Sequence, residues 1–233
     1  MAFAIPLFLI AAASAFLAML FQGEAWLLVW PSVCFLVLSI TYAFNVPQIL
    51  GKKSSGTIVW PAILFFFPYF LMTWILWHLL RCLSSEPSWN VAVSGIWIGR
   101  RLLHSELPPE IDVIVDLTAE FVESRRVRDG KRYHCLPILD ASIPDMAAFR
   151  PFVNELAKTE GSIFIHCASG HGRTGLFAAA LLLARGLSAS ADDAIKMLRA
   201  ARPAVRLNRV QKLFLQGYAA SAMEVKLNDS TNK

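Results

Sequence analysis

Apolar residues fill the first third of the chain almost without interruption, and a regular alternation with polar residues begins only after it. Residues 4–21, 25–44 and 57–80 contain no Asp, Glu, Lys or Arg, and each is near the ~20 residues that an apolar helix needs to cross a bilayer. Tryptophans lie toward the ends of these stretches, as is common at a membrane–water interface. The pattern therefore predicts three transmembrane helices within a membrane region of residues 1–81.

This pattern predicts an integral, multi-pass membrane protein, although residues 4–21 could instead be a signal peptide. They lack a preceding basic segment, which favours a retained helix. Lys52 and Lys53 place the second connection in the cytoplasm by the positive-inside rule, whereas three arginines after the third stretch place the rest of the chain there. The two counts nearly cancel, so they leave the orientation open.

From residue 82 onward the pattern becomes that of a soluble domain of about 150 residues, which is enough for one hydrophobic core. Short strand-like runs alternate with segments of helical periodicity. The strands are expected at residues 91–98, 111–117, 133–139 and 162–166, and the helices at residues 146–156, 173–185, 189–201 and 208–222. Alternation of this kind predicts an α/β domain built on a layered sheet.

The charge distribution argues against a nucleic-acid partner. The chain carries 22 Lys and Arg against 17 Asp and Glu, and only Glu24, Lys52 and Lys53 precede Arg81. The remaining 20 basic and 16 acidic residues form a mild excess without a basic stripe, so we expect no nucleic acid to bind. A mildly basic surface suits an anionic bilayer or phosphorylated substrates, and membrane lipids are expected partners.

The four cysteines, Cys34, Cys82, Cys135 and Cys167, show no spacing typical of a zinc site or a disulfide framework. Cys167 stands out because of its surroundings, residues 163–175, which read IFIHCASGHGRTG. A nucleophilic thiolate favours a reducing compartment. We therefore expect the C-terminal domain to lie in the cytoplasm.

In this segment an apolar strand-like run ends at Cys167, and Arg173 opens a helix after a short loop. Gly170 and Gly172 let the loop close so that successive backbone N–H groups point inward as a nest for an anion, and the helix adds the positive end of its dipole. The thiolate is the nucleophilic form of cysteine, and Arg173 can grip two phosphate oxygens. The alternative is a buried structural cysteine, which would not require an arginine at that position.

The order of cysteine, five residues, arginine and threonine resembles the signature of the cysteine-dependent protein tyrosine phosphatases. With His166 in front and Gly175 behind, it is most similar to the compact dual-specificity branch. The resemblance extends over residues 89–218 and includes Arg202-Pro203 followed by Gln211. It implies a dual-specificity-phosphatase-like catalytic domain over residues 82–233, with a central mixed sheet flanked by helices.

The same resemblance assigns roles within the loop. Thr174 would hydrogen-bond the cysteine sulfur and help it leave, and His166 would orient the loop and favour the thiolate. The substrate phosphate would be held by the loop, which comprises Ala168, Ser169, Gly170, His171, Gly172 and Arg173. No metal or other cofactor is implied.

Cleavage of a phosphate ester also needs a proton for the leaving oxygen, and the nest itself supplies only donors to the phosphate. Asp140 follows a strand-like run, opens a turn-rich loop and lies 27 residues before Cys167. We therefore expect Asp140 to act as general acid and then as general base for the hydrolytic water. Asp145 is the alternative, but it is better placed as the N-cap of a helix that begins at Met146.

Two residues keep two interpretations each. His171 could add positive charge near the phosphate, or it could be a neutral, half-exposed filler. Gln211 could position the hydrolytic water, or it could face solvent on the last helix. Asp116 and Glu120 follow a core strand and are expected to be structural.

These residues predict a membrane-anchored phosphatase that forms a phosphocysteine intermediate, with phosphotyrosine, phosphoserine or phosphothreonine in proteins as substrate. The first alternative is the same chemistry on a phospholipid monophosphate such as phosphatidylglycerophosphate. Ala168, Ser169 and Gly170 add no cation to the loop, which weakens a polyphosphoinositide substrate but not a monophosphate lipid. An inert phosphate-binding module and a thiol-exchange enzyme that uses Cys135 are further alternatives.

Overall fold

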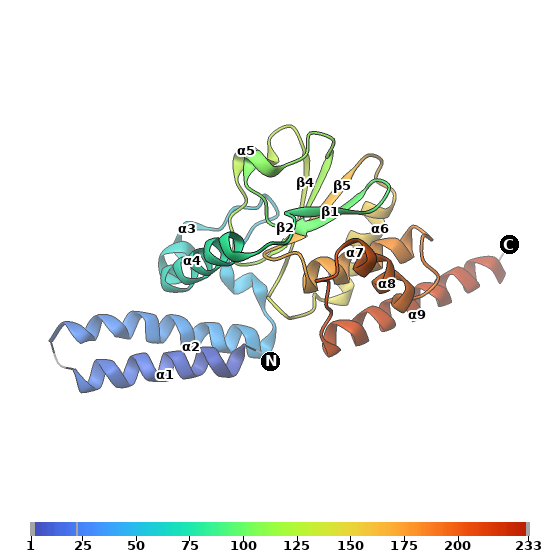
Figure 1. Ribbon diagram of the computed structural model, residues 1–233. Helices are drawn as coiled ribbons and strands as arrows, with labels where there is room; N and C mark the ends of the chain where they lie inside the picture. Colours follow the sequence, from blue (N-terminus) through green and yellow to red (C-terminus); the bar gives the residue numbers. More distant parts are fainter. Residues whose placement is uncertain (1–2, 22, 232–233) are drawn as a thin grey trace. The chain divides into compact units, whose positions relative to one another are not determined.

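The structure is a computed structural model that describes residues 3–21 and 23–231 (Figure 1). It divides into two compact units, Met1–Ser85 with Ala119–Val122, and Glu86–Thr118 with Glu123–Lys233. The first unit is helical. The second unit contains the β-sheet and the residues for which we predict chemistry.

The helical unit is built from apolar segments joined by short turns. Its elements are α1 (Ala4–Leu20), η1 (Gly23–Leu28), α2 (Val29–Phe44), η2 (Pro47–Leu50), α3 (Trp60–Phe65) and α4 (Phe67–Leu83). Helices α1 and α2 run side by side (Figure 1), and Ser39 Oγ of α2 donates a hydrogen bond of 2.8 Å to Ala4 O of α1. The two hydroxyl groups of Tyr42 and Tyr69 lie 3.2 Å apart and connect α2 to α4.

Only part of the predicted membrane region meets the requirements for a span. Among the described residues, one helical stretch, Gly23–Phe44, is long and apolar enough, with 22 residues and a mean hydropathy of 2.0. The 17 residues of α1 rise about 25 Å, short of a hydrocarbon core of about 30 Å. The expected third span is broken at Phe66 because Pro68 opens a new helix there. The prediction of three spans is thus reduced to one candidate, and a signal sequence would pass the same test.

The sheet of the second unit is mixed, as the resemblance implied. Its strands are β1 (Trp89–Val93), β2 (Ile96–Arg100), β3 (Val113–Thr118), β4 (Arg132–Ile138) and β5 (Ile163–Cys167). They lie in the order β1-β2-β5-β3-β4, in which β1 is antiparallel to β2 and the other neighbours are parallel. The single strand expected at residues 91–98 is wrong, because Gly95 adopts a φ of +78° and turns the chain into a hairpin.

Helices and loops cover both faces of the sheet. The helical elements are η3 (His104–Glu106), α5 (Arg125–Arg128), α6 (Met146–Ala157), α7 (Gly172–Ala184), α8 (Ala191–Ala201) and α9 (Arg209–Thr231). Side chains alternate along β5, so that Ile163 and Ile165 pack in the main core with α6 to α9, whereas Phe164 packs in a smaller core on the other face. The α/β interpretation is therefore confirmed.

This arrangement puts the signature loop at the middle of the sheet. Strand β5 has a parallel neighbour on each side, and in the register His166 lies beside Gly99 of β2 and Asp116 of β3. Cys167 is the last residue of β5 and lies beside Arg100. The loop therefore starts at the carboxyl edge of the sheet, where α/β proteins commonly bind ligands.

Candidate active site

The loop from β5 to α7 surrounds the thiol of Cys167, a residue that is 3% exposed. The backbone N–H of Gly170 donates to Cys167 Sγ at 3.3 Å. Gly170 has a φ of +77°, and a Cβ at this position would lie 2.3 Å from the carbonyl carbon of Gly99. Glycine is therefore required here both by the backbone conformation and by the close approach of β2.

Arg173 joins the signature loop to the loop that follows β4. Its side chain is 1% exposed, and Nη1 donates to the carbonyl oxygen of Ile138 at 2.9 Å. Its Nη2 lies 3.2 Å from Oδ1 of Asp140, whose side chain is 54% exposed. The structure thus brings the expected acid to the expected phosphate-binding arginine, although the two lie 33 residues apart in the sequence.

The two candidate acids occupy different environments. Asp145 is the N-cap of α6, because its Oδ2 accepts a hydrogen bond of 3.2 Å from the backbone N–H of Ala148. Asp140 caps none of the described helices and is followed by Ala141, which has a φ of +55°. A positive φ costs energy for a residue with a Cβ, so this turn is held by its surroundings. The geometry favours Asp140 over Asp145 as the proton donor.

Two other predicted site residues, His166 and Thr174, lie at the two ends of the signature segment. Thr174 is fully buried, and its hydroxyl has no hydrogen-bond partner among the described residues, including the sulfur. His166 is 1% exposed, stacks on Phe164 with ring centroids 5.4 Å apart, and has Nδ1 3.4 Å from the carbonyl oxygen of Cys167. A carbonyl only accepts, so this contact requires the proton on Nδ1.

The structure shows the surroundings of His171 and Gln211, the two residues for which two interpretations were open. His171 is 37% exposed, and its Nε2 lies 2.8 Å from Oε2 of Glu86. Gln211 is 1% exposed, which rules out the solvent-facing interpretation. Its Nε2 donates to the carbonyl oxygen of Ser142 at 3.0 Å, and a Cβ on Gly172 would lie 3.1 Å from its Oε1. Gln211 therefore lies between the acid loop and the signature loop.

Asn208 strengthens the same connection. Its Nδ2 donates to Ala141 O at 2.7 Å, and its Oδ1 accepts from the backbone N–H of Gln211 at 2.9 Å. Gln211 Oε1 in turn accepts from the backbone N–H of Asn208 at 3.1 Å. This is a reciprocal cap at the start of α9, and it also fixes the residues after Asp140.

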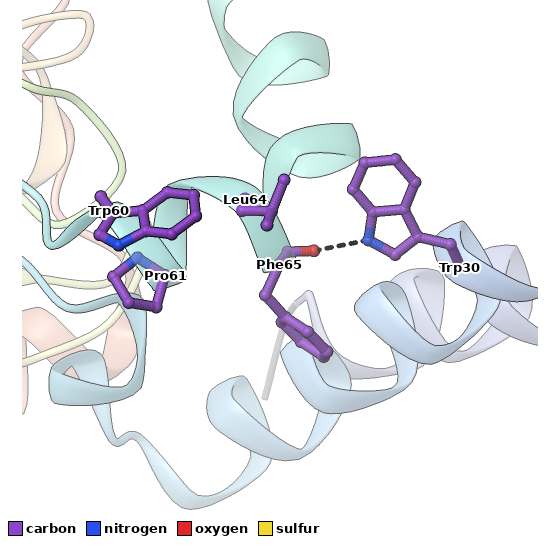
Figure 2. Close-up of a pocket in the computed structure, with 5 residues that line it drawn as sticks. All are labelled: Trp30, Trp60, Pro61, Leu64 and Phe65. Carbon is purple, nitrogen blue, oxygen red and sulfur yellow. Dashed lines mark hydrogen bonds between the residues drawn. The ribbon is translucent and has the colours of Figure 1, made fainter.

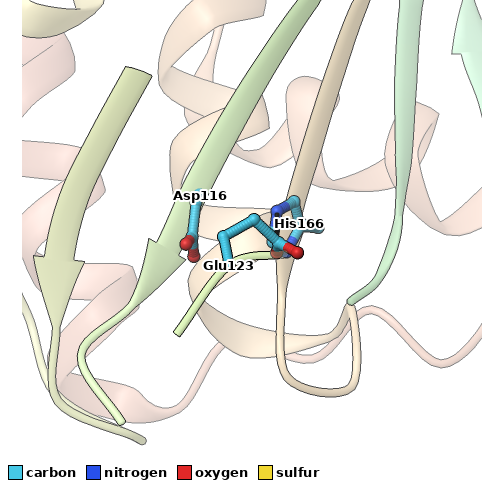
Figure 3. Close-up of side chains that lie close together, drawn as sticks. All are labelled: Asp116, Glu123 and His166. Atoms are coloured by element: carbon cyan, nitrogen blue, oxygen red, sulfur yellow. Dashed lines mark ion pairs between the residues drawn. The ribbon is translucent and has the colours of Figure 1, made fainter. Parts of the chain in front are cut away.

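A buried cluster that the sequence did not reveal lies behind the loop. Asp116, Glu123 and His166 each offer a ligand atom, and these atoms lie within 4.8 Å of one another (Figure 3). Glu123 Oε2 lies 3.6 Å from His166 Nε2 and 3.6 Å from Nε of Arg101. Glu123 comes from irregular chain after β3, where no local pattern points to it.

The donor set is one that a divalent cation could use, but both oxygens of Asp116 already accept hydrogen bonds. Asp116 Oδ1 accepts from the N–H and the hydroxyl of Thr118 at 2.8 and 2.7 Å, and Oδ2 accepts from the hydroxyl of Tyr133 at 2.6 Å. Burial and the negative charge of Asp116 raise the pKa of Tyr133, which keeps that proton in place. Arg101 supplies positive charge to Glu123, so we assign the cluster to loop support.

An apolar hollow lies in the helical unit. It is about 490 Å³ in volume and is lined by Trp30, Trp60, Pro61, Leu64 and Phe65 (Figure 2). Trp30 Nε1 donates to the carbonyl oxygen of Phe65 at 3.0 Å. The hollow offers no titratable group and therefore no means of phosphate chemistry.

Comparison with known proteins agrees with this geometry. Residues 105–219 match the family model described as "Dual specificity phosphatase, catalytic domain". Mouse "Dual specificity protein phosphatase CDC14A" is 35% identical over 74 residues, which are 31% of this chain and 12% of that protein. The chain thus matches about an eighth of the length of this curated relative.

Solved structures give the fold. PTPMT1 superposes with a TM-score of 0.54 at 15% identity, over 60% of this chain and 99% of that chain. Tk-PTP in its active form superposes with a TM-score of 0.51 at 24% identity, over 57% and 97%. At these identities the structures show the fold alone, and the family match with the CDC14A relative supports a cysteine-dependent protein phosphatase domain.

Proposed function

We infer that this chain is a phosphatase that hydrolyses phosphate monoesters of proteins through a phosphocysteine intermediate. The observation that carries the inference is the pairing of buried Arg173 with Asp140 beside a loop whose Gly170 N–H points at the sulfur of Cys167. A structural cysteine would need neither the arginine nor the acid. The site joins a nucleophile, an oxyanion grip and a proton donor.

In the first step the Cys167 thiolate attacks phosphorus in line, and the S–P bond forms as the P–O bond to the leaving group breaks. Arg173 and the loop amides hold the equatorial oxygens, where charge spreads in the transition state. Asp140 gives its proton to the departing oxygen, which leaves as an alcohol or phenol. Asp140 is then a carboxylate.

In the second step a water attacks the phosphocysteine, and Asp140 takes one proton from that water. The S–P bond breaks, inorganic phosphate forms and the thiolate returns. The buried hydroxyl of Thr174 is free of other partners among the described residues, so it is available to donate to the leaving sulfur. Gln211 bonds the acid loop through Ser142 O, and this contact supports the proposal that it helps to orient the water. Neither step requires a metal.

The test is phosphate release by the full chain purified in detergent, beside Cys167→Ser. We expect release from phosphotyrosyl and phosphothreonyl peptides and none from the variant, because serine is far less nucleophilic at neutral pH. Full activity in Cys167→Ser would refute the mechanism. No release by the native chain, with tungstate still bound, would identify an inert phosphate-binding module instead.

A phospholipid monophosphate is the second candidate substrate. The apolar N-terminal unit favours it, because a catalytic domain linked to such a unit would be held where lipid headgroups are concentrated. A structure of PTPMT1, whose fold the second unit resembles, was solved in complex with PI(5)P. A phosphatidylglycerophosphate dispersion in the same assay decides between the two, since preference for the dispersion over both peptides would assign the enzyme to lipid metabolism.

We further propose that residues 23–44 anchor the chain in a membrane, with the catalytic domain in the cytoplasm. The length and hydropathy of this stretch support the anchor, and the need for a reduced nucleophile supports the compartment. Cys82 is exposed, whereas Cys34, Cys135 and Cys167 are buried, so Cys82 is a native reporter of sidedness. A membrane-impermeant maleimide should label it only after intact cells are opened. Labelling in intact cells would overturn the orientation.

A further inference from the structure

A buried arginine, Arg202, donates hydrogen bonds to backbone carbonyls of the signature loop. Arg202, the C-cap of α8, is 2% exposed. Its Nη2 donates to Ser169 O at 3.3 Å and its Nε donates to Gly170 O at 3.2 Å. Its remaining bonds go to segments before β2, namely Pro87 O at 2.8 Å, Asn90 Oδ1 at 2.9 Å and Glu86 Oε2 at 3.0 Å.

The two loop carbonyls determine where the loop amides point. In a trans peptide the C=O and the following N–H point in opposite directions. Since Ser169 O is directed at Arg202, the N–H of Gly170 is directed away from it, toward the sulfur of Cys167 at 3.3 Å. By the same geometry, the bond from Arg202 to Gly170 O turns the N–H of the next residue to the opposite side. Arg202 therefore orients amides that an oxyanion would use.

Glu86 is the counter-charge of this arrangement. Its Oε2 accepts from Arg202 Nη2 at 3.0 Å and lies 2.8 Å from His171 Nε2. One carboxylate oxygen therefore joins the arginine behind the loop to the histidine within it. Burial lowers the pKa of Arg202, and the negative charges of Glu86 and Cys167 oppose this shift. The other acceptors of Arg202 described above are neutral, so Glu86 supplies the negative charge that stabilises the buried guanidinium.

We propose that Glu86 is a positioning residue for the oxyanion cradle, acting through Arg202 and His171. This proposal rests on the proposed function and deepens it, because it assigns the shape of the loop to a residue outside the signature. Simple electrostatics predicts the opposite role for an acid beside an anion site, because its negative charge repels the ligand. A positioning role therefore predicts that removing the Glu86 charge weakens anion binding, whereas simple repulsion predicts that it strengthens anion binding.

The experiment is calorimetric titration of the full chain in detergent with tungstate, an oxyanion that is not turned over. We expect Glu86→Gln to weaken tungstate binding about tenfold, the order of a lost hydrogen bond to a charged group. Glu86→Asp should also weaken it, since the charge remains but the oxygen is withdrawn by one methylene. Glu110→Gln makes the same chemical change at an exposed carboxylate and should change affinity less than about twofold.

The outcomes are separable. Unchanged or tighter binding by Glu86→Gln, in protein that unfolds within a few degrees of the native chain, would overturn the positioning role while leaving the phosphatase intact. A native chain that binds tungstate but releases no phosphate would refute the proposed function and leave the role of Glu86 measurable. Absence of tungstate binding by the native chain would refute both. Equal losses in His171→Asn and in its double variant with Glu86→Gln would show that the carboxylate acts through the histidine.

Discussion

Replacing Asp140 with alanine removes a carboxylate whose Oδ1 lies 3.2 Å from Arg173 Nη2 and whose side chain is 54% exposed. A half-exposed ion pair contributes roughly 0.2–1 kcal/mol to the free energy of unfolding, so the fold should tolerate the change. A positioned general acid contributes about 10²–10⁴-fold in rate, which is roughly 2.7–5.4 kcal/mol of barrier. Catalysis should therefore fall far more than stability.

The leaving group supplies the diagnostic. An acid matters most when the departing oxygen is strongly basic, so we expect Asp140→Ala to lower kcat/KM about 100-fold or more for phenyl phosphate and less than about tenfold for p-nitrophenyl phosphate. The ratio kcat/KM is the right quantity, because it reports the step in which the leaving group departs and not the later hydrolysis. Full-chain protein, a series of aryl phosphates and a thermal melt complete the assay.

Asp145→Ala is the matched control. It deletes the N-cap of α6 and should lower the free energy of unfolding by about 1 kcal/mol without a dependence on the leaving group. If Asp145→Ala shows the graded loss and Asp140→Ala does not, the assignment of the acid is wrong. A loss of equal size for both aryl phosphates in Asp140→Ala would also refute it, since the residue would then act on binding or loop shape.

Three further outcomes are expected. Cys167→Ser should abolish turnover yet retain tungstate binding by calorimetry, since serine leaves the cradle in place. Gly170→Ala should abolish that binding, because its Cβ would meet the backbone of β2, whereas Gly130→Ala, with a φ of +69° and open space around it, should change binding less than about twofold. Burial raises the pKa of Glu106, but the hydrogen bonds and charge of Arg100 outweigh this effect and leave the pKa lowered. The stability that this carboxylate contributes is therefore fully present above its pKa in the unfolded chain, about 4.3, and is lost as the pH falls through its lower pKa in the folded chain. Acid unfolding of Glu106→Gln should lack that component.

The sequence predicted the parts of the molecule that depend on local pattern. The apolar run before Cys167 predicted β5, and the helical periodicity after Arg173 predicted α7, because both are buried and regular. The hairpin of β1 and β2 was missed because its turn, Ser94-Gly95, is short and lies within an apolar run. Helix breaks in the N-terminal unit were missed because uncharged composition does not report where a proline ends a helix.

The active-site signature was local as well, but the groups that support it were not. Glu86, Glu123 and Arg202 support the loop from three separate segments. Only Arg202 was part of the resemblance, through Arg202-Pro203 followed by Gln211, and even there the sequence did not indicate its contact with the loop carbonyls. Their roles depend on which strands are neighbours and on which carbonyls face outward. Such contacts follow from topology, so a single sequence without its fold does not contain a visible signal for them.

The reciprocal cap at the start of α9 has a consequence for communication across the domain. Asn208 and Gln211 stabilise the first turn of the helix and, with the same side chains, bind the carbonyls of Ala141 and Ser142 next to the acid. Fraying of this turn would therefore also remove the hydrogen bonds that hold the acid loop. By thermodynamic linkage, any ligand that closes the acid loop must also slow amide hydrogen exchange at Gln211, and a partner that unwinds α9 would lower the catalytic rate without contact with the signature loop.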